Sequence, residues 1–319
     1  MKYMDDINKI RNNINEILIG KEDKVEFVLN AFLSGGHILL EDVPGVGKTT
    51  LANALARSLD VSFGRIQFTP DTLPSDVTGI SIYNMETCNF EYMKGAIMHN
   101  IILADEINRT SPKTQASLLE AMEEKQVTVD GKIHQLEEPF MVIATQNPID
   151  FLGTYNLPEA QLDRFLMRIS IGYPDTRQEI KMVNNYLENK RLGTVKAVCS
   201  REIITEVMKE VEHIFVDSDI INFIVEITEA TRNNEQLTLG ASPRATLALI
   251  RSAQSAAYLK GRDYVIPDDV LHILEPVLCH RMVLSMEAKL NKQKAEDILR
   301  SILKKIKVPV LKNKSNENK

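Results

Sequence analysis

In the first half of the chain, short apolar runs alternate with longer stretches in which apolar residues recur every three or four positions. The short runs predict buried strands, and the longer stretches predict helices that pack against them. Strands are expected at residues 37–40, 65–68, 101–104, 141–144 and 167–171. Helices are expected at 24–34, after residue 50, and at Pro112–Glu124, where Ser111 occupies the N-cap position. This alternation is typical of an α/β fold with a central parallel sheet.

Past Tyr173 and Pro174 the strand signals fade, and the pattern becomes helical. Helices are expected at residues 177–189, 201–211, 218–233, 243–259, 267–277 and 289–305. We therefore predict an α/β core at 1–174, an all-α domain at 175–308 and a flexible basic tail at 309–319. Two stretches look inserted into the core: residues 79–95, and residues 127–138, which are expected to form a hairpin turning at Asp130-Gly131.

A glycine-containing loop follows the first apolar run and leads into a helical stretch. The loop reads Val43-Pro44-Gly45-Val46-Gly47-Lys48-Thr49-Thr50. A strand, such a loop and a helix form the phosphate cradle of P-loop proteins, in which the lysine contacts the β/γ-phosphates and the threonine hydroxyl contacts Mg²⁺. The alternative is a glycine turn that binds nothing, but the loop, the lysine and the flanking elements all agree on a nucleotide site. One position departs from the usual pattern, because Asp42 stands where the first glycine is expected.

Acidic and amide side chains follow two other predicted strands. Asp105 and Glu106 end one strand, where open α/β sheets bind ligands. Asp105 can hold the water shell of the Mg²⁺, and Glu106 can act as general base on the attacking water; the alternative is a solvated acidic turn. Asn147 or Thr145, at the end of the next strand, could bind this water or the γ-phosphate, unless Asn147 only starts a turn with Pro148.

Three arginines are candidates for neutralising charge on the transferred phosphoryl group. They are Arg109, Arg164 and Arg244. A guanidinium in this role changes the rate by orders of magnitude. The alternative for each, on sequence alone, is an ordinary ion-paired arginine.

Composition limits the function further. The net charge of −6 argues against a protein that coats nucleic acid. Three scattered cysteines are typical of reduced thiols, no window is apolar enough to span a membrane, and the polar N-terminus lacks a signal-peptide core. We therefore expect a cytoplasmic protein without a membrane span.

Long segments resemble the MoxR family of AAA+ ATPases, in order along residues 10 to 308. The resemblance rests on residues 65–79, 103–109, 113–122, 144–148, 157–165, 172–174, 240–245 and 261–265. It implies a P-loop AAA+ core with a central parallel sheet, followed by an all-α lid domain. The inserted stretches match the helix-2 insert and the pre-sensor-1 hairpin, which in this clade face the ring surface or pore. Two departures, Asp42 and Ala96, leave the catalytic set intact.

The resemblance also implies a role for each candidate residue. Gly45 to Thr50 match the Walker A loop, with Gly45, Val46, Gly47, Lys48, Thr49 and Thr50 binding nucleotide. Asp105 and Glu106 match Walker B, and Asn147 matches sensor 1. Arg244 matches sensor 2 on the lid, and Arg164 matches the arginine finger that acts on a neighbour's ATP. Ile19-Gly20 match the loop that packs on adenine.

The expected function is Mg²⁺-dependent ATP hydrolysis by a ring, expected to be a hexamer, coupled to remodelling a client protein or inserting a metal or cofactor. A protein with a von Willebrand factor A domain is the typical partner. Alternatives are a magnesium-chelatase-like subunit, a nucleic-acid-stimulated motor and a scaffold that uses ATP only to close a ring. The sequence does not identify the client.

Overall fold

The computed structural model describes residues 1–147, 154–187 and 195–310. Its internal contacts divide the chain into two units. Lys2–Met208 form the sheet unit, and Lys209–Lys319, with which Met1 is grouped, form the helical unit. No helix in these described ranges is long and apolar enough to cross a membrane.

The sheet unit is built on a five-stranded sheet in the order β2-β5-β8-β1-β9, and all neighbouring strands are parallel. The strands are β1 (Ile38–Glu41), β2 (Phe63–Gln67), β5 (Ile101–Asp105), β8 (Met141–Gln146) and β9 (Met167–Ile169). The α/β class with a central parallel sheet is thus confirmed. Because all strands run the same way, the loops after β1, β5 and β8 open at one edge, where such sheets bind ligands.

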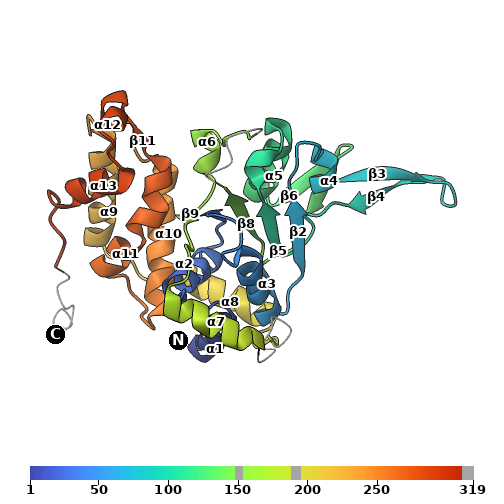
Figure 1. The fold of residues 1–319 in the computed structure, drawn as a ribbon, viewed down its shortest axis with the longest axis horizontal. Coiled ribbons are helices and arrows are strands. Elements are labelled where there is room, and N and C mark those ends of the chain that lie inside the picture. Colours follow the sequence, from blue (N-terminus) through green and yellow to red (C-terminus); the bar gives the residue numbers. More distant parts are fainter. Residues whose placement is uncertain (148–153, 188–194, 311–319) are drawn as a thin grey trace, which may run out of the picture. The chain divides into compact units, whose positions relative to one another are not determined.

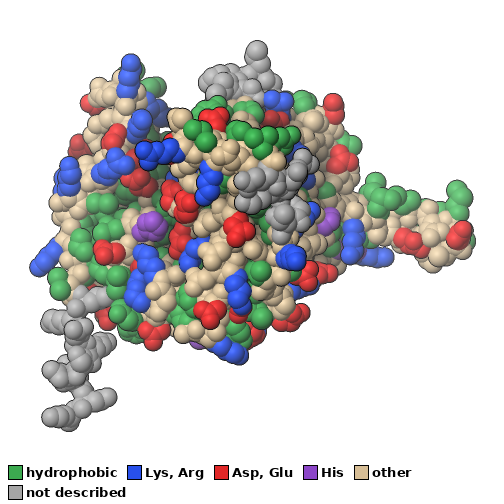
Figure 2. Space-filling model, turned by 60° about the horizontal axis from the view of Figure 1, so that its bottom comes forward, with side chains coloured by type: hydrophobic (Ala, Val, Ile, Leu, Met, Phe, Trp, Pro, Cys, Tyr) green, Lys and Arg blue, Asp and Glu red, His purple; other side chains and the backbone are tan. Residues whose placement is uncertain are grey.

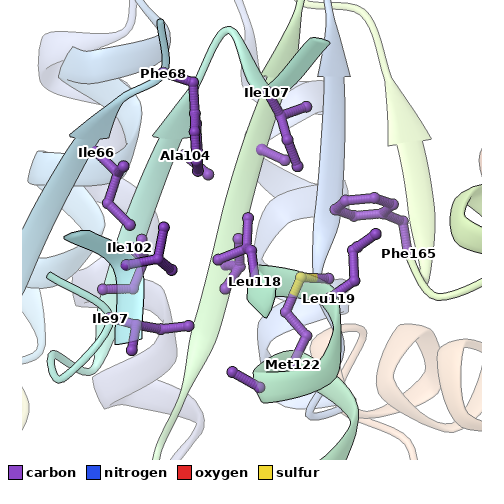
Figure 3. Close-up of a cluster of buried hydrophobic side chains, with 14 of the residues drawn as sticks. Ile66, Phe68, Ile97, Ile102, Ala104, Ile107, Leu118, Leu119, Met122 and Phe165 are labelled. Atoms are coloured by element: carbon purple, nitrogen blue, oxygen red, sulfur yellow. The ribbon is translucent and has the colours of Figure 1, made fainter. Parts of the chain in front are cut away.

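The central strands of the sheet, β1, β5 and β8, are buried on both faces. On one face, side chains of β2 and β5, such as Ile66 and Ile102, pack against Leu118, Leu119 and Met122 of α5 (Figure 3). The alternating positions of β5 are equally buried and point to the other face, where α3 contacts the strand. Burial on both faces explains why these strands read as continuous apolar runs.

Helices and short turns complete the sheet unit. They are α1 (Met4–Ile17), α2 (Glu22–Leu33), α3 (Lys48–Ser58), α4 (Pro74–Thr78), η1 (Ile107–Arg109), α5 (Pro112–Glu124), α6 (Glu159–Leu162), α7 (Thr176–Leu187) and α8 (Arg201–Glu212), whose last residues cross into the helical unit. The bounds expected for α5 are confirmed, and Ser111 Oγ accepts from Thr114 N as its cap. The first helix, α1, was missed, although Ile7, Ile10 and Ile14 form its buried stripe.

Both stretches that look inserted are two-stranded antiparallel hairpins. Strands β3 (Gly79–Asn84) and β4 (Asn89–Lys94) form one, which extends away from the sheet (Figure 1). Its exposed face carries apolar side chains, and Figure 2 shows them along the projecting hairpin. Strands β6 (Gln126–Val129) and β7 (Lys132–Gln135) form the other and turn at Asp130-Gly131, as expected.

The helical unit contains long helices and one small ladder. Its elements are α9 (Ser218–Arg232), β10 (Leu237–Leu239), α10 (Pro243–Leu259), α11 (Pro267–Leu278), η3 (Cys279–Arg281), β11 (Val283–Leu284), α12 (Met286–Leu290) and α13 (Ala295–Leu303). The antiparallel pair β10–β11 is absent from the all-α expectation. The single helix expected at 289–305 is broken into α12 and α13, because Lys292 adopts a left-handed conformation with φ 54°.

The contact boundary lies within α8, later than the boundary expected near Asp175. The segment up to α8 is hydrogen-bonded to the sheet unit. Asn13 Nδ2 donates to Lys196 O (2.9 Å), and Arg201 Nη1 pairs with Glu137 Oε2 (2.6 Å). These long-range bonds are invisible in a pattern of local signals. Most of the expected basic tail, from residue 311, lies outside the described residues.

Candidate functional site

The P-loop lies between β1 and α3 and depends on two left-handed glycines. Gly45 has φ 87° and Gly47 has φ 98°, conformations that L side chains rarely adopt. Gly47 is the N-cap residue of α3, so Lys48 and Thr49 form its first turn. The free backbone N–H groups of this turn and the helix dipole favour an anion at the loop.

Asp42, the departure from the usual loop pattern, anchors the start of the loop to the chain after β9. The residue is buried, with 5% of its surface exposed. Its Oδ1 accepts from Ser170 Oγ (2.8 Å) and Gly172 N (3.0 Å), and its Oδ2 accepts from Ile171 N (2.5 Å). Asp42 is therefore a buried structural residue that ties the start of the P-loop to residues 170–172, a role that the sequence did not reveal.

The main-chain carbonyl of Asp42 has a second partner, because it accepts a hydrogen bond from Lys48 Nζ at 2.9 Å. Partial burial lowers the pKa of Lys48, and the negative charge of Asp105 opposes this shift. The ammonium thus lies between the loop backbone and the acidic pair.

Thr145 on β8 holds both acids in place. Its hydroxyl is fully buried, donates to Asp105 Oδ1 (2.7 Å) and accepts from Glu106 N (2.8 Å). Glu106 has φ 58°, a left-handed conformation that costs on the order of 1 kcal/mol in a non-glycine residue. The hydrogen bond from Glu106 N supports this conformation. Asn147 and Thr145 were the two candidates for binding the attacking water or the γ-phosphate. The hydroxyl of Thr145 is instead hydrogen-bonded to Asp105 and Glu106.

Asn147, the other candidate, lines the cavity itself. The cavity has a volume of about 400 Å³ and opens at the carboxyl edge of the sheet. Its lining combines the P-loop with residues of β2 and with the acidic pair: Pro44, Gly45, Gly47, Lys48, Thr49, Thr50, Arg65, Gln67, Asp105, Glu106 and Asn147. The structure therefore brings together the predicted Walker A residues other than Val46, the acidic pair and Asn147.

The residues present fit a Mg²⁺ ion that is shared with a nucleotide. Mg²⁺ in such sites uses one or two carboxylates together with substrate phosphates and water. Asp105 and the Thr49 hydroxyl line the same cavity and supply this donor set. Within the described ranges, no group of three or more His, Cys, Asp or Glu could hold a metal by itself.

Two further side chains of β2 contact the acids, and the sequence did not single them out. Arg65 Nη2 donates to Asp105 Oδ2 (2.7 Å), and Gln67 Nε2 donates to Glu106 Oε2 (3.0 Å). The predicted candidate Arg109 also reaches Glu106 Oε2, with Nε at 3.2 Å. The only sequence signal for Arg65 and Gln67 is their alternation on a strand, and it becomes informative once β2 is known to lie beside β5.

The loop predicted to contact adenine lies beside the P-loop. Gly20 has φ 68°, and Ile19 is half-buried. A Cβ atom on Gly47 would lie 3.0 Å from Leu18 Cδ1, so this loop packs directly against the phosphate loop. A contact of Ile19 and Gly20 with the base stays a prediction.

Arg164 is held by α5 of its own sheet unit. Its Nη1 donates to Leu119 O (2.8 Å), and its Nη2 pairs with Glu123 Oε2 at 3.3 Å. Among the described residues, it does not belong to the cavity lining. Arg244 lies in the helical unit, in the first turn of α10, whose N-cap Ser242 accepts from Ala245 N. The roles of both arginines towards ATP stay predictions.

Comparison with known proteins agrees with this geometry. Residues 37–167 match the sequence model of the ATPase family associated with various cellular activities (AAA), and residues 229–302 match that of the AAA lid domain.

Two relatives and one solved structure match nearly the whole chain. The YeaC protein of Bacillus subtilis is 50% identical over 97% of this chain and 98% of its own length. Chaperone MoxR1 of Mycobacterium tuberculosis is 39% identical over 93% of this chain and 80% of its own length. The crystal structure of a candidate ATPase from Cytophaga hutchinsonii superposes with a TM-score of 0.90 at 38% identity, covering 97% of this chain and 96% of that one.

Proposed function

Because this chain belongs to the MoxR family of AAA+ ATPases, we propose that it hydrolyses ATP with Mg²⁺ between neighbouring subunits of a ring. The observation that carries this proposal is the single cavity wall formed by the P-loop, Asp105, Glu106 and Asn147. A phosphate cradle next to a carboxylate pair serves phosphoryl transfer to water.

The residues of this wall divide the work. The N–H groups of the loop and Lys48 bind the β/γ-phosphates. Outside this wall, Ile19 and Gly20 of the adjacent loop are proposed to pack on the base. Thr49 and, through its water shell, Asp105 would hold a Mg²⁺ ion, which would supply positive charge to these phosphates. Glu106 accepts a proton from the attacking water, and Asn147 orients this water or the γ-phosphate.

A ring is proposed because Arg164 does not belong to the described lining of the cavity in its own subunit. Arg164 is proposed to reach the ATP of a neighbouring subunit, where its guanidinium stabilises the transition state. Arg244, in the lid, is proposed to sense the γ-phosphate. A hexamer is the expected ring size.

We further propose that hydrolysis remodels a client or helps to insert a metal or cofactor, as the relation to chaperone MoxR1 suggests. The β3–β4 hairpin supports a protein partner, because Met85 and Phe90 expose 85% and 67% of their surface. A protein with a von Willebrand factor A domain is the partner we expect. The three scattered cysteines favour a cytoplasmic location.

Glu106→Gln tests the catalytic assignment. Loss of the general base should lower phosphate release about 10²- to 10⁴-fold while ATP binding stays intact. Glu120→Gln, which changes an exposed glutamate of α5, is the matched control and should keep wild-type turnover. Unchanged turnover in Glu106→Gln would remove Glu106 from its role as base.

Mixed rings test the shared site. Neither Lys48→Ala nor Arg164→Ala subunits should hydrolyse ATP alone. In an equal random mixture, about one interface in four combines an intact Lys48 with an intact Arg164 from the neighbour. Partial recovery of phosphate release is therefore expected, and its absence in rings of confirmed size would contradict action in trans.

A further inference from the structure

Strand β2 directs two polar side chains at the acids of the neighbouring strand β5. Side chains alternate along a strand, and in β2 Ile66 is buried whereas Arg65 and Gln67 are exposed on the opposite face. The register pairs Gln67 with Asp105, so both polar residues lie beside the acidic end of β5. Arg65 and Gln67 are also part of the cavity wall.

The guanidinium of Arg65 holds a specific oxygen of Asp105. One nitrogen, Nη2, donates both to Asp105 Oδ2 (2.7 Å) and to Gln67 Oε1 (2.8 Å). The other carboxylate oxygen, Oδ1, accepts from the buried Thr145 hydroxyl. Thr145 thereby fixes the rotation of the carboxylate, and Oδ2 is left as the oxygen that both Arg65 and the water shell of a metal ion can use.

We propose that Arg65 competes with Mg²⁺ for Asp105 and so sets the Mg²⁺ concentration at which the nucleotide site loads. An oxygen has two lone pairs, so two donors could share it, but a guanidinium carries a permanent positive charge. Two cations at one carboxylate repel each other, and this repulsion is stronger in a protein cavity than in water. Arg65 is therefore a positioning residue: it must leave Asp105 when the metal approaches.

The size of the effect follows from the exposure of the pair. The Arg65 side chain is 47% exposed, and that of Asp105 is 14% exposed. Solvent screens such a pair, which places it near the upper end of surface ion pairs, equivalent to about a three- to fivefold change in an equilibrium constant. Because β2 is an edge strand and the arginine is half in solvent, its replacement should leave the fold intact.

The inference rests on the proposed function and is tested by equilibrium binding. A fluorescent, non-hydrolysable ATP analogue is bound at constant ionic strength while Mg²⁺ is titrated. Arg65→Ala and Arg65→Gln should lower the half-saturating Mg²⁺ about three- to fivefold, and Arg65→Lys, which keeps the charge, should lower it less. Arg201→Ala removes another exposed arginine–carboxylate pair of the sheet unit and should leave the midpoint unchanged.

A double-mutant cycle separates action through Asp105 from a general effect of charge. In an Asp105→Asn background, Arg65→Ala should no longer shift the Mg²⁺ midpoint. The inference is overturned if Arg65→Ala leaves the Mg²⁺ midpoint unchanged or raises it, or if the shift is equal in both backgrounds. In either case, nucleotide binding by the wild type still supports the proposed nucleotide site. Failure of the wild type to bind the analogue at saturating Mg²⁺ overturns the inference together with the proposed function.

Discussion

Removing the carboxylate of Asp42 should destabilise the sheet unit and weaken nucleotide binding. Asp42→Ala leaves the N–H groups of Ile171 and Gly172 and the Ser170 hydroxyl without their acceptor. A buried donor that loses its partner costs about 1–3 kcal/mol, and part of this loss is offset because an ionised carboxylate no longer has to be desolvated. We therefore expect a net loss of about 3 kcal/mol. In a domain of this size, such a loss lowers Tm by about 6 to 12 °C.

The assay is thermal unfolding combined with nucleotide affinity, measured with three variants. Asp42→Asn should lie between the wild type and Asp42→Ala, because its amide oxygen can still accept from Ser170 and Gly172 while its –NH₂ faces the donor Ile171 N. Asp42→Gly restores the usual loop residue but none of the three hydrogen bonds, so it should be as unstable as Asp42→Ala. ATP affinity should fall in each, since the Asp42 carbonyl that binds Lys48 moves with the loop.

Asp71→Ala is the matched control, because Asp71 is an exposed aspartate of the same unit and its loss should change stability by less than about 0.5 kcal/mol. A Tm for Asp42→Ala within error of that control would refute the claim that the Asp42 carboxylate stabilises the sheet unit. Wild-type stability in Asp42→Asn would instead show that the negative charge contributes nothing.

Substitutions of two other buried residues, His37 and Thr145, give further testable predictions. Burial lowers the pKa of His37 to about 4 from 6.5. Its neutral ring accepts a hydrogen bond from Val142 N and donates one to Met122 O. The stability that neutral His37 contributes is therefore fully present above pH 6.5 and is lost as the pH falls towards 4, by about 2 kcal/mol at pH 5. Denaturant unfolding at pH 7 and pH 5 should show this loss in the wild type and not in His37→Gln, and an equal loss in both would contradict it. Thr145→Val strips Asp105 and Glu106 of their shared hydroxyl and should lower phosphate release more than ATP affinity, whereas Thr145→Ser should retain both; wild-type turnover in the valine variant would count against the role of the hydroxyl.

Local signals were sufficient where the chain folds locally. Ser111 and Pro112 determine where α5 begins, and the expected bounds of this helix agree with the structure. The strand, loop and helix around Gly47 are also adjacent in sequence, so these three elements could be predicted from local signals. The break at Lys292 could not be predicted, because nothing in its sequence marks a lysine for the left-handed region.

Strand order was the limiting unknown for the site. Arg65 matters because β2 pairs with β5, and this pairing joins segments that lie far apart along the chain. Asp42 matters because β1 pairs with β9, which brings residues 170–172 to its carboxylate. From sequence alone, the first was an unremarked arginine and the second an irregular loop residue.

The charged groups of the cavity all have protein partners, and this determines how nucleotide affinity should be understood. Lys48 bonds to the Asp42 carbonyl, Asp105 to Arg65, and Glu106 to Gln67. Binding of Mg²⁺ and ATP therefore exchanges these contacts for new ones, and only the difference between the two sets appears as affinity. Substituting Arg65 changes only the contacts of the free protein, whereas substituting Lys48 changes both these contacts and the contacts with bound nucleotide. The variants that report most clearly on metal binding are therefore those of β2, outside the P-loop.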